Sequence, residues 1–228
     1  YGLFFDPATL LEPCTPDPGG SCLALATGAG AASRARAAAT LADLRARNPN
    51  LVLVVEVKYR EQQDTQLPAS HRFWQRDAQG NRVAGWSEGT YVSYLLDWHD
   101  SEVRALVAQQ ARAAVAAGLD GVFLDWWDDN DDDRLALARA VRDAIGDRLL
   151  IVNNNDRPLP RSAQWINGSY MEGYRSATVA DWQGLATTLR SNEALLRRPR
   201  LSPIETWYAS SRLDLDRMRA TTTLSLTQ

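Results

Sequence analysis

The sequence predicts an α/β chain that folds as a (β/α)8 TIM barrel. Short apolar runs alternate with longer helical patterns, which is typical of repeated βα units. Several of these runs end in carboxylate, amide or tryptophan side chains, and a parallel barrel opens the carboxyl ends of all its strands on one face. With 228 residues, 45% of them hydrophobic, the chain is long enough to bury a full core. We therefore expect residues 1–228 to form a single barrel domain.

The apolar runs predict seven strands, one fewer than a complete barrel contains. They are 2–6 (GLFFD), 51–57 (LVLVVEV), 91–98 (YVSYLLDW), 121–125 (GVFLD), 149–155 (LLIVNNN), 166–172 (INGSYME) and 201–207 (LSPIETW). Four helices are expected between them, at 33–47, 101–117, 131–145 and 178–196. Ser101 is the expected N-cap of the second helix, and Gly118 is expected to end it. An open doubly wound sheet is disfavoured, because no glycine-rich phosphate turn follows the first run.

The connection at 61–89 is longer than an ordinary βα loop. It contains His71, Phe73, Trp74 and Trp86 around a turn at DAQGN, and this aromatic content argues against disorder. We expect a lid or wall over the barrel mouth. A hairpin that packs its own small core is the alternative.

Charge and hydropathy limit the classes of partner. A net charge of −3 and a pI near 5.5 give no general attraction to nucleic acid or to an anionic membrane surface. The sequence has no apolar run long enough to span a membrane. We therefore expect neither a nucleic-acid partner nor a membrane span, and the sequence does not indicate an oligomeric state.

Two cysteines, Cys14 and Cys22, lie on either side of the turn-rich stretch TPDPGGS. A disulfide between them is the favoured interpretation, and two unrelated free thiols are the alternative. A disulfide predicts a secreted or periplasmic protein.

Tryptophans and acidic residues together suggest a carbohydrate site. Of the eight tryptophans, Trp98, Trp126, Trp127 and Trp207 fall at or just after strand ends. Flat rings with one polar edge suit the C–H faces of sugars, and carboxylates and amides suit the hydroxyls around them. Burial in the core is an equally good explanation for any single tryptophan.

Hydrolysis of a glycosidic bond requires two carboxyl groups beside the bond, one to donate a proton and one to act as nucleophile or base. Asp125 is the first candidate because it ends the strand GVFLD, on the same face as Phe123. Glu172 is the second, with Gly173 beside it leaving room for a ligand, and Glu205 is the reserve acid. The alternatives are a helix-capping or loop-closing role for Asp125 and an ion pair with Lys58 or Arg175 for Glu172.

Ten further strand-end residues are predicted to bind the substrate: Glu56, Lys58, Asp97, Trp98, Trp126, Asn153, Asn155, Tyr170, Glu205 and Trp207. No metal or cofactor is expected. His71 and His99 are the only histidines, too few for converging metal ligands. A barrel that binds polysaccharide without cleaving it is the alternative function, since it would keep the tryptophans without needing two opposed carboxyl groups.

The motifs GLDGVFLDWW, LLIVNNN and INGSYMEGY resemble glycosyl hydrolase barrels related to endo-α-1,4-polygalactosaminidase-like proteins, over about residues 50–210. The resemblance implies a glycoside hydrolase that retains the anomeric configuration. It implies a nucleophilic aspartate at strand four and an acid/base carboxylate at strand six, which match Asp125 and Glu172. The sequence departs from this pattern at MRATTTLSLTQ (218–228), which is expected to be the helix before strand eight. Either the sequence is cut there or the barrel closes in an unusual way.

The acidic run after Asp125 has two interpretations. Carboxylates at the start of a helix complement the positive end of the helix dipole, and this is the favoured explanation. A calcium site is the alternative, although the spacing lacks the glycine and distal glutamate of a calcium-binding loop. The run comprises Asp128, Asp129, Asp131, Asp132 and Asp133.

Overall fold

A computed structural model describes residues 2–4, 31–64, 67–173, 176–205, 207–208 and 213–226 of the chain. The predicted Cys14–Cys22 disulfide lies outside the described residues. Among the described residues, no helix combines the length and the apolar character that crossing a bilayer would need.

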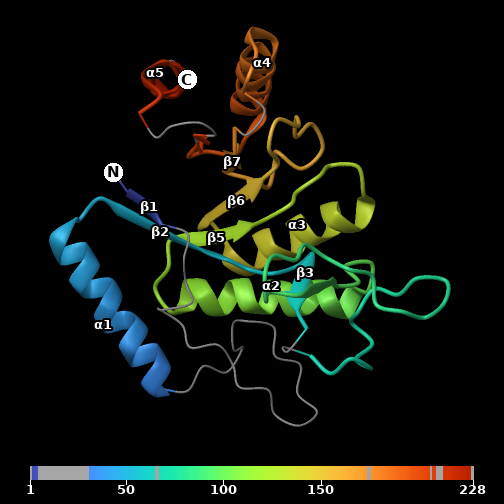
Figure 1. The fold of residues 1–228 in the computed structure, drawn as a ribbon. Coiled ribbons are helices and arrows are strands. Elements are labelled where there is room, and N and C mark those ends of the chain that lie inside the picture. Colours follow the sequence, from blue (N-terminus) through green and yellow to red (C-terminus); the bar gives the residue numbers. More distant parts are fainter. Residues whose placement is uncertain are drawn as a thin grey trace.

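A parallel sheet forms the centre of the fold (Figure 1). Its strand order is β1-β2-β5-β6-β7, and every neighbouring pair is parallel. The 201–204 segment continues the array, because Leu201 and Ile204 form parallel bridges with Gly168 and Met171. The predicted parallel α/β architecture is confirmed. The strands are β1 (Gly2–Phe4), β2 (Leu51–Glu56), β5 (Gly121–Leu124), β6 (Leu149–Asn153) and β7 (Gly168–Tyr170).

Within the described residues, five helices accompany this sheet, and they include the four predicted ones. In Figure 1, α2 and α3 lie side by side along the sheet. The helices α4 and α5 lie on the side of β7, the last strand in the sheet order. Apolar residues at helical spacing explain the packing, for example Val103, Val107 and Ala111 of α2, which are fully buried. The helices are α1 (Ala31–Arg47), α2 (Ser101–Ala116), α3 (Asp132–Ile145), α4 (Val179–Leu195) and α5 (Leu215–Leu226).

The ends of α2 partly follow the prediction. Asp100, not Ser101, is the N-cap, and its carboxylate accepts a hydrogen bond from the backbone N–H of Glu102 at 2.8 Å. The expectation for Ser101 was wrong because the preceding aspartate already supplies a side-chain oxygen that can accept this bond. Gly118 has φ of 102° just after the helix, a conformation that glycine adopts without steric cost.

The strand run predicted at 91–98 does not belong to the parallel sheet. Its middle forms β4 (Ser93–Leu95), which pairs antiparallel with β3 (Glu61–Gln63) in a separate two-stranded sheet. Bridges from Trp74 to Leu96 and from Ala84 to Tyr94 extend this antiparallel structure through the long connection. Phe73 and Trp74 are buried in the core that contains α2 and α3, so the connection does not form a separate small core.

Alternation along the parallel strands gives the sheet two different faces. Leu53, Val55, Val122 and Leu124 pack with α2 and α3 in the main core. The intervening residues form a second apolar cluster on the opposite, inner face. This inner cluster comprises Val54, Phe123 and Ile151, with Val52, Leu149, Tyr170 and Leu201 packed against it.

Candidate active site

The candidate site continues the inner face of the sheet beyond its apolar cluster. In or just after β2, β5, β6, β7 and the 201–204 segment, a polar residue comes two or four positions after an inner apolar one. The same alternation that buries the apolar residues therefore brings the polar ones together. These residues are Glu56, Asp125, Asn153, Glu172 and Glu205.

Asp125 and Glu172 are linked by a single amide group. Nδ2 of Asn153 donates to Oδ1 of Asp125 at 2.7 Å and to Oε1 of Glu172 at 3.1 Å. Because both distances start at one nitrogen, 2.7 and 3.1 Å together set an upper limit of about 5.8 Å on the separation of the two oxygens. The two carboxyl groups therefore face one small space.

Two pockets open beside this pair. The Asp125 pocket has a volume of only about 10 Å³, and it is lined by Glu56, Val57, Lys58, Tyr59, Arg60, Glu61, Asp125 and Trp126. The Glu172 pocket has a volume of about 130 Å³, and it is lined by Trp126, Trp127, Asn153, Asn154, Asn155, Arg157 and Glu172. Trp126 lines both pockets.

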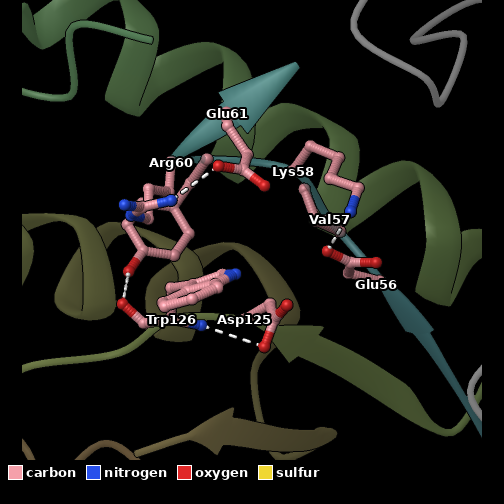
Figure 2. A pocket seen from close by; sticks show the side chains of 8 residues that line it. Glu56, Val57, Lys58, Arg60, Glu61, Asp125 and Trp126 are labelled. Carbon is pink, nitrogen blue, oxygen red and sulfur yellow. Dashed lines mark hydrogen bonds and ion pairs between the residues drawn. The ribbon is translucent and has the colours of Figure 1, made fainter. Parts of the chain in front are cut away.

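Several contacts hold Trp126 in place (Figure 2). It has φ of 54°, an unfavourable conformation for a bulky residue, and such strain is typical of functional sites. Its N–H donates to Oδ1 of Asp125 at 3.0 Å, and its carbonyl accepts from the hydroxyl of Tyr59 at 2.7 Å. The guanidinium of Arg60 lies over the ring, 4.6 Å from its centroid. The side chain is nevertheless 48% exposed, so part of the ring is available to a ligand.

Four charged residues of the Asp125 pocket form two ion pairs (Figure 2). Lys58 Nζ lies 2.6 Å from Glu56 Oε1, and Arg60 Nη1 lies 2.5 Å from Glu61 Oε2. Burial raises the pKa of Glu56 above its ordinary value, although Lys58 opposes this shift. Burial lowers the pKa of Lys58, but the charge and hydrogen bond of Glu56 outweigh it, so the pKa of Lys58 is raised.

Glu172 is in an environment that favours its protonated form. Burial raises its pKa, and the negative charges of Asp125 and Glu205 raise it further. The hydrogen bonds from Asn153 and Asn155 oppose this rise without cancelling it. Asn155 Nδ2 lies 3.5 Å from Oε2 of Glu172, so the two asparagines contact different oxygens of the carboxyl group.

Glu205 is held beside this pair by Tyr170, whose hydroxyl donates to Oε2 of Glu205. The sequence suggested that Gly173 leaves room for a ligand, but the backbone of Glu205 occupies the space where a side chain would lie. Gly173 has φ of 63°, and a Cβ at this position would lie 2.5 Å from the backbone carbonyl oxygen of Glu205. The close approach of the 201–205 segment explains why glycine occurs here.

Five predicted substrate-binding residues line neither pocket. Tyr170 and Glu205 still lie beside the carboxyl pair, whereas Asp97, Trp98 and Trp207 do not contact it. Trp98 is only 7% exposed in the main core, and its Nε1 donates to Asp131 at 2.7 Å. Asp97 contacts the neighbouring His99. Both predictions depended on placing 91–98 in the parallel sheet, which was wrong. Trp207 is 52% exposed, and its carbonyl accepts from Arg217.

The acidic run starts α3, as the favoured interpretation predicted. Asp131 is the N-cap, and Asp132 and Asp133 lie in the first turn. Asp129 is buried and accepts hydrogen bonds from Trp127, Arg161 and Ser162. The remaining carboxylates pair with arginines: Asp128 with Arg157, Asp132 with Arg161, and Asp133 with Arg104. Each carboxylate of the run thus has a hydrogen-bond or ion-pair partner within the chain.

Some lining residues were not identified from the sequence. Tyr59, Arg60 and Glu61 directly follow the strand that supplies Glu56 and Lys58, so their position after a strand end was a usable signal. Arg157 follows the asparagines of β6 in the same way.

Comparison with known proteins shows the fold but no family. No family model and no curated protein sequence matches the chain. Among solved structures, it is similar to the α-galactosidase TtGalA from Thermus thermophilus in complex with stachyose, with a TM-score of 0.56 and 21% identity. That match covers 82% of this chain and 46% of the galactosidase.

Two α-amylases are also similar in structure. The enzyme from Lactobacillus plantarum has a TM-score of 0.52 and 13% identity, over 75% of this chain and 44% of the amylase. The maltogenic α-amylase AmyB from Thermotoga neapolitana has a TM-score of 0.50 and 16% identity, over 70% of this chain and 39% of AmyB. The chain thus shares the barrel fold of these glycoside hydrolases and spans less than half the length of each.

Proposed function

We propose that the chain is a retaining glycoside hydrolase, with Asp125 as nucleophile and Glu172 as general acid/base. The observation that carries this proposal is the contact of both carboxyl groups with one Asn153 nitrogen. Retaining glycosidases hold their two carboxyl groups about 5 Å apart, whereas inverting enzymes need about 6.5–9.5 Å to admit a water molecule. The upper limit of about 5.8 Å between Asp125 Oδ1 and Glu172 Oε1 favours retention.

The reaction would proceed in two displacements. Protonated Glu172 donates its proton to the leaving oxygen while Asp125 attacks the anomeric carbon, so the glycosidic bond breaks and a glycosyl ester forms on Asp125. Glu172, now ionised, then takes a proton from water, and this water attacks the anomeric carbon and releases Asp125. The raised pKa of Glu172 supports its role as the acid, because it keeps the proton available at higher pH.

The exposed ring of Trp126 and the larger volume of the Glu172 pocket support binding of a sugar there. Glu56 and Lys58 reach the same site from the Asp125 pocket and are suited to sugar hydroxyls. We propose an oligosaccharide or polysaccharide as substrate. A specific relationship to endo-α-1,4-polygalactosaminidase-like proteins rests on the sequence motifs alone and belongs to this proposal. A carbohydrate-binding protein without activity would not need two carboxyl groups held so close together.

Digestion of a polysaccharide panel tests the proposal. The panel contains α-galactosides, α-glucans and galactosamine polymers, and new reducing ends are measured together with the anomer first released, by NMR. We expect retention, and a loss of at least about 10²-fold in kcat for both D125N and E172Q. E88Q, at an exposed glutamate outside both pockets, is the matched control.

Three results would contradict parts of this assignment. Undiminished hydrolysis by D125N and E172Q would exclude both catalytic roles. A loss with E205Q but not with E172Q would move the acid role to Glu205. Binding of a panel member without any cleavage would favour the carbohydrate-binding alternative.

We also propose an exported location, on the basis of Cys14 and Cys22 alone. The intact mass before and after reduction, with alkylation of free thiols, tests the underlying disulfide. Two thiols that alkylate without a reductant would contradict it.

A further inference from the structure

We infer that Asn153 is a positioning residue of the candidate active site, which holds Asp125 and Glu172 at a fixed separation and leaves one defined oxygen of Asp125 to react. The inference rests on the proposed function for its chemical meaning. The structural claim, that the amide of Asn153 holds both carboxyl groups by hydrogen bonds, can be tested separately from the proposed function.

A side-chain amide nitrogen carries two hydrogens, and here each has its own carboxylate acceptor. Nδ2 of Asn153 lies 2.7 Å from Asp125 and 3.1 Å from Glu172. Both donors are thus used by the two proposed catalytic groups. Movement of either carboxyl group away from the other would stretch one of these hydrogen bonds.

The amide itself is held in the required orientation. Oδ1 of Asn153 accepts from the backbone N–H of Asn155 at 3.2 Å, which directs Nδ2 toward the carboxyl groups. The backbone carbonyl of Asn153 accepts from the N–H of Trp127 at 2.7 Å, and the residue pairs with Tyr170 in the sheet. The side chain is 7% exposed, so little room remains for it to turn.

The same contacts distinguish the two oxygens of Asp125. Oδ1 accepts from both Asn153 and the N–H of Trp126, whereas Oδ2 accepts no hydrogen bond from the described part of the chain. Oδ2 is therefore the oxygen that can approach an anomeric carbon without first losing a hydrogen bond.

An amide suits this position because it stays neutral while its partners change charge. Glu172 alternates between acid and carboxylate in the proposed cycle, and its oxygen can accept from Asn153 in either state. The hydrogen bond is stronger to the carboxylate, which explains why Asn153 lowers the pKa of Glu172 against the effect of burial.

Titration of the carboxyl groups in the unliganded protein tests the inference without a substrate. The chain is labelled with ¹³C at glutamate Cδ, and the Glu172 signal is assigned by its absence in E172Q. We expect Glu172 to titrate at higher pH in N153A than in wild type, because the stabilised carboxylate loses a donor. N155G, which removes the longer contact, is the graded comparison and should shift the titration less.

A Glu172 titration that is unchanged or lowered in N153A would overturn the inference. If N153A does not fold, N153S is titrated instead and judged by the same criterion, because a serine hydroxyl cannot donate to both carboxyl groups. If a substrate is found, the high-pH limit of kcat should shift in the same direction with little change in KM. Absence of hydrolysis by the wild type would contradict the proposed function but would leave the titration result intact.

Discussion

Trp126 shows how a single residue connects the two pockets of the site. Its backbone lies in the left-handed region, and the hydroxyl of buried Tyr59 holds its carbonyl. Burial raises the pKa of Tyr59, so the hydroxyl stays protonated and can donate over the whole neutral range. The position of the Trp126 ring therefore depends on Tyr59.

Tyr59→Phe removes this hydrogen bond and keeps the buried ring. We expect a loss of about 1 kcal/mol in the free energy of unfolding, as for a typical hydrogen bond. We also expect a more mobile Trp126, seen as a narrower indole N–H signal in the NMR spectrum, which is assigned by its absence in Trp126→Phe.

Tyr94→Phe is the matched control for this variant. The Tyr94 ring packs on Trp74, and its hydroxyl makes no hydrogen bond within the described residues. Equal changes in the two variants would show that the Tyr59 hydroxyl does not hold Trp126.

Among single residues of the candidate site, those whose positions follow from strand alternation could be predicted from the sequence. Asp125, Asn153 and Glu172 could be predicted because each comes at the end of an apolar run and on one face of it. The contacts of Tyr59 and Arg60 with Trp126 could not, because they join residues more than sixty positions apart and depend on a left-handed turn. No local pattern encodes such a contact.

Among the elements, the run at 91–98 was predicted to be a strand of the parallel barrel, but its middle forms the antiparallel strand β4. The buried parallel strands β2, β5 and β6 are almost continuously apolar, as expected for strands covered on both faces. YVSYLLDW instead interrupts its apolar residues with Ser93, as is common in antiparallel strands. The difference in composition could have separated β4 from the sheet, although its partner β3 was not recognisable from three polar residues.

Asp131 connects α3 to the rest of the fold. Its carboxylate accepts from the backbone N–H groups of Asp133 and Arg134 and from the indole of Trp98. Asp131→Ala should reduce the free energy of unfolding by about 1–2 kcal/mol, as expected for loss of an N-cap. Urea denaturation measures this difference.

Asp132→Ala provides the comparison for this prediction. Asp132 lies in the same helical turn, but its ion pair with Arg161 is exposed to solvent, and such pairs contribute little to stability. A loss as large as that of Asp131→Ala would contradict the capping argument.

At the scale of the whole molecule, the site should reduce stability at neutral pH. The pKa of Glu172 is raised in the folded chain, so folding favours the protonated carboxyl group. The stabilisation is complete below the unfolded pKa of about 4.5 and is lost as the pH rises through the folded pKa. Ionised Glu172 then opposes folding.

Glu172→Gln removes this unfavourable charge. We expect the variant to unfold at a higher temperature than wild type near pH 7, with a smaller difference near pH 4. Glu88→Gln, on the exposed surface, controls for a general effect of net charge. A variant less stable than wild type at neutral pH would contradict the electrostatic argument.

The parallel α/β architecture was easier to predict from the sequence than any detail of the candidate site. Alternating apolar runs and helices indicated a parallel α/β fold, and the similarity to solved barrels agrees with it. That residues 1–228 form one domain stays a prediction. The separation of the two carboxyl groups could not be predicted, because it depends on the relative register of β5, β6 and β7, which side-chain packing determines.

The arrangement of the polar residues on alternate positions has a consequence for how such a chain can evolve. The loops that lead into β2, β5 and β6 carry none of the residues that line the two pockets, so they can gain or lose residues without disturbing the site. A single inserted residue within β5, however, would turn Asp125 toward the helices and bring a neighbouring side chain into its place. Related proteins that keep the two carboxyl groups in the site should therefore differ in the length of these loops. Any insertion or deletion within a strand should comprise two residues.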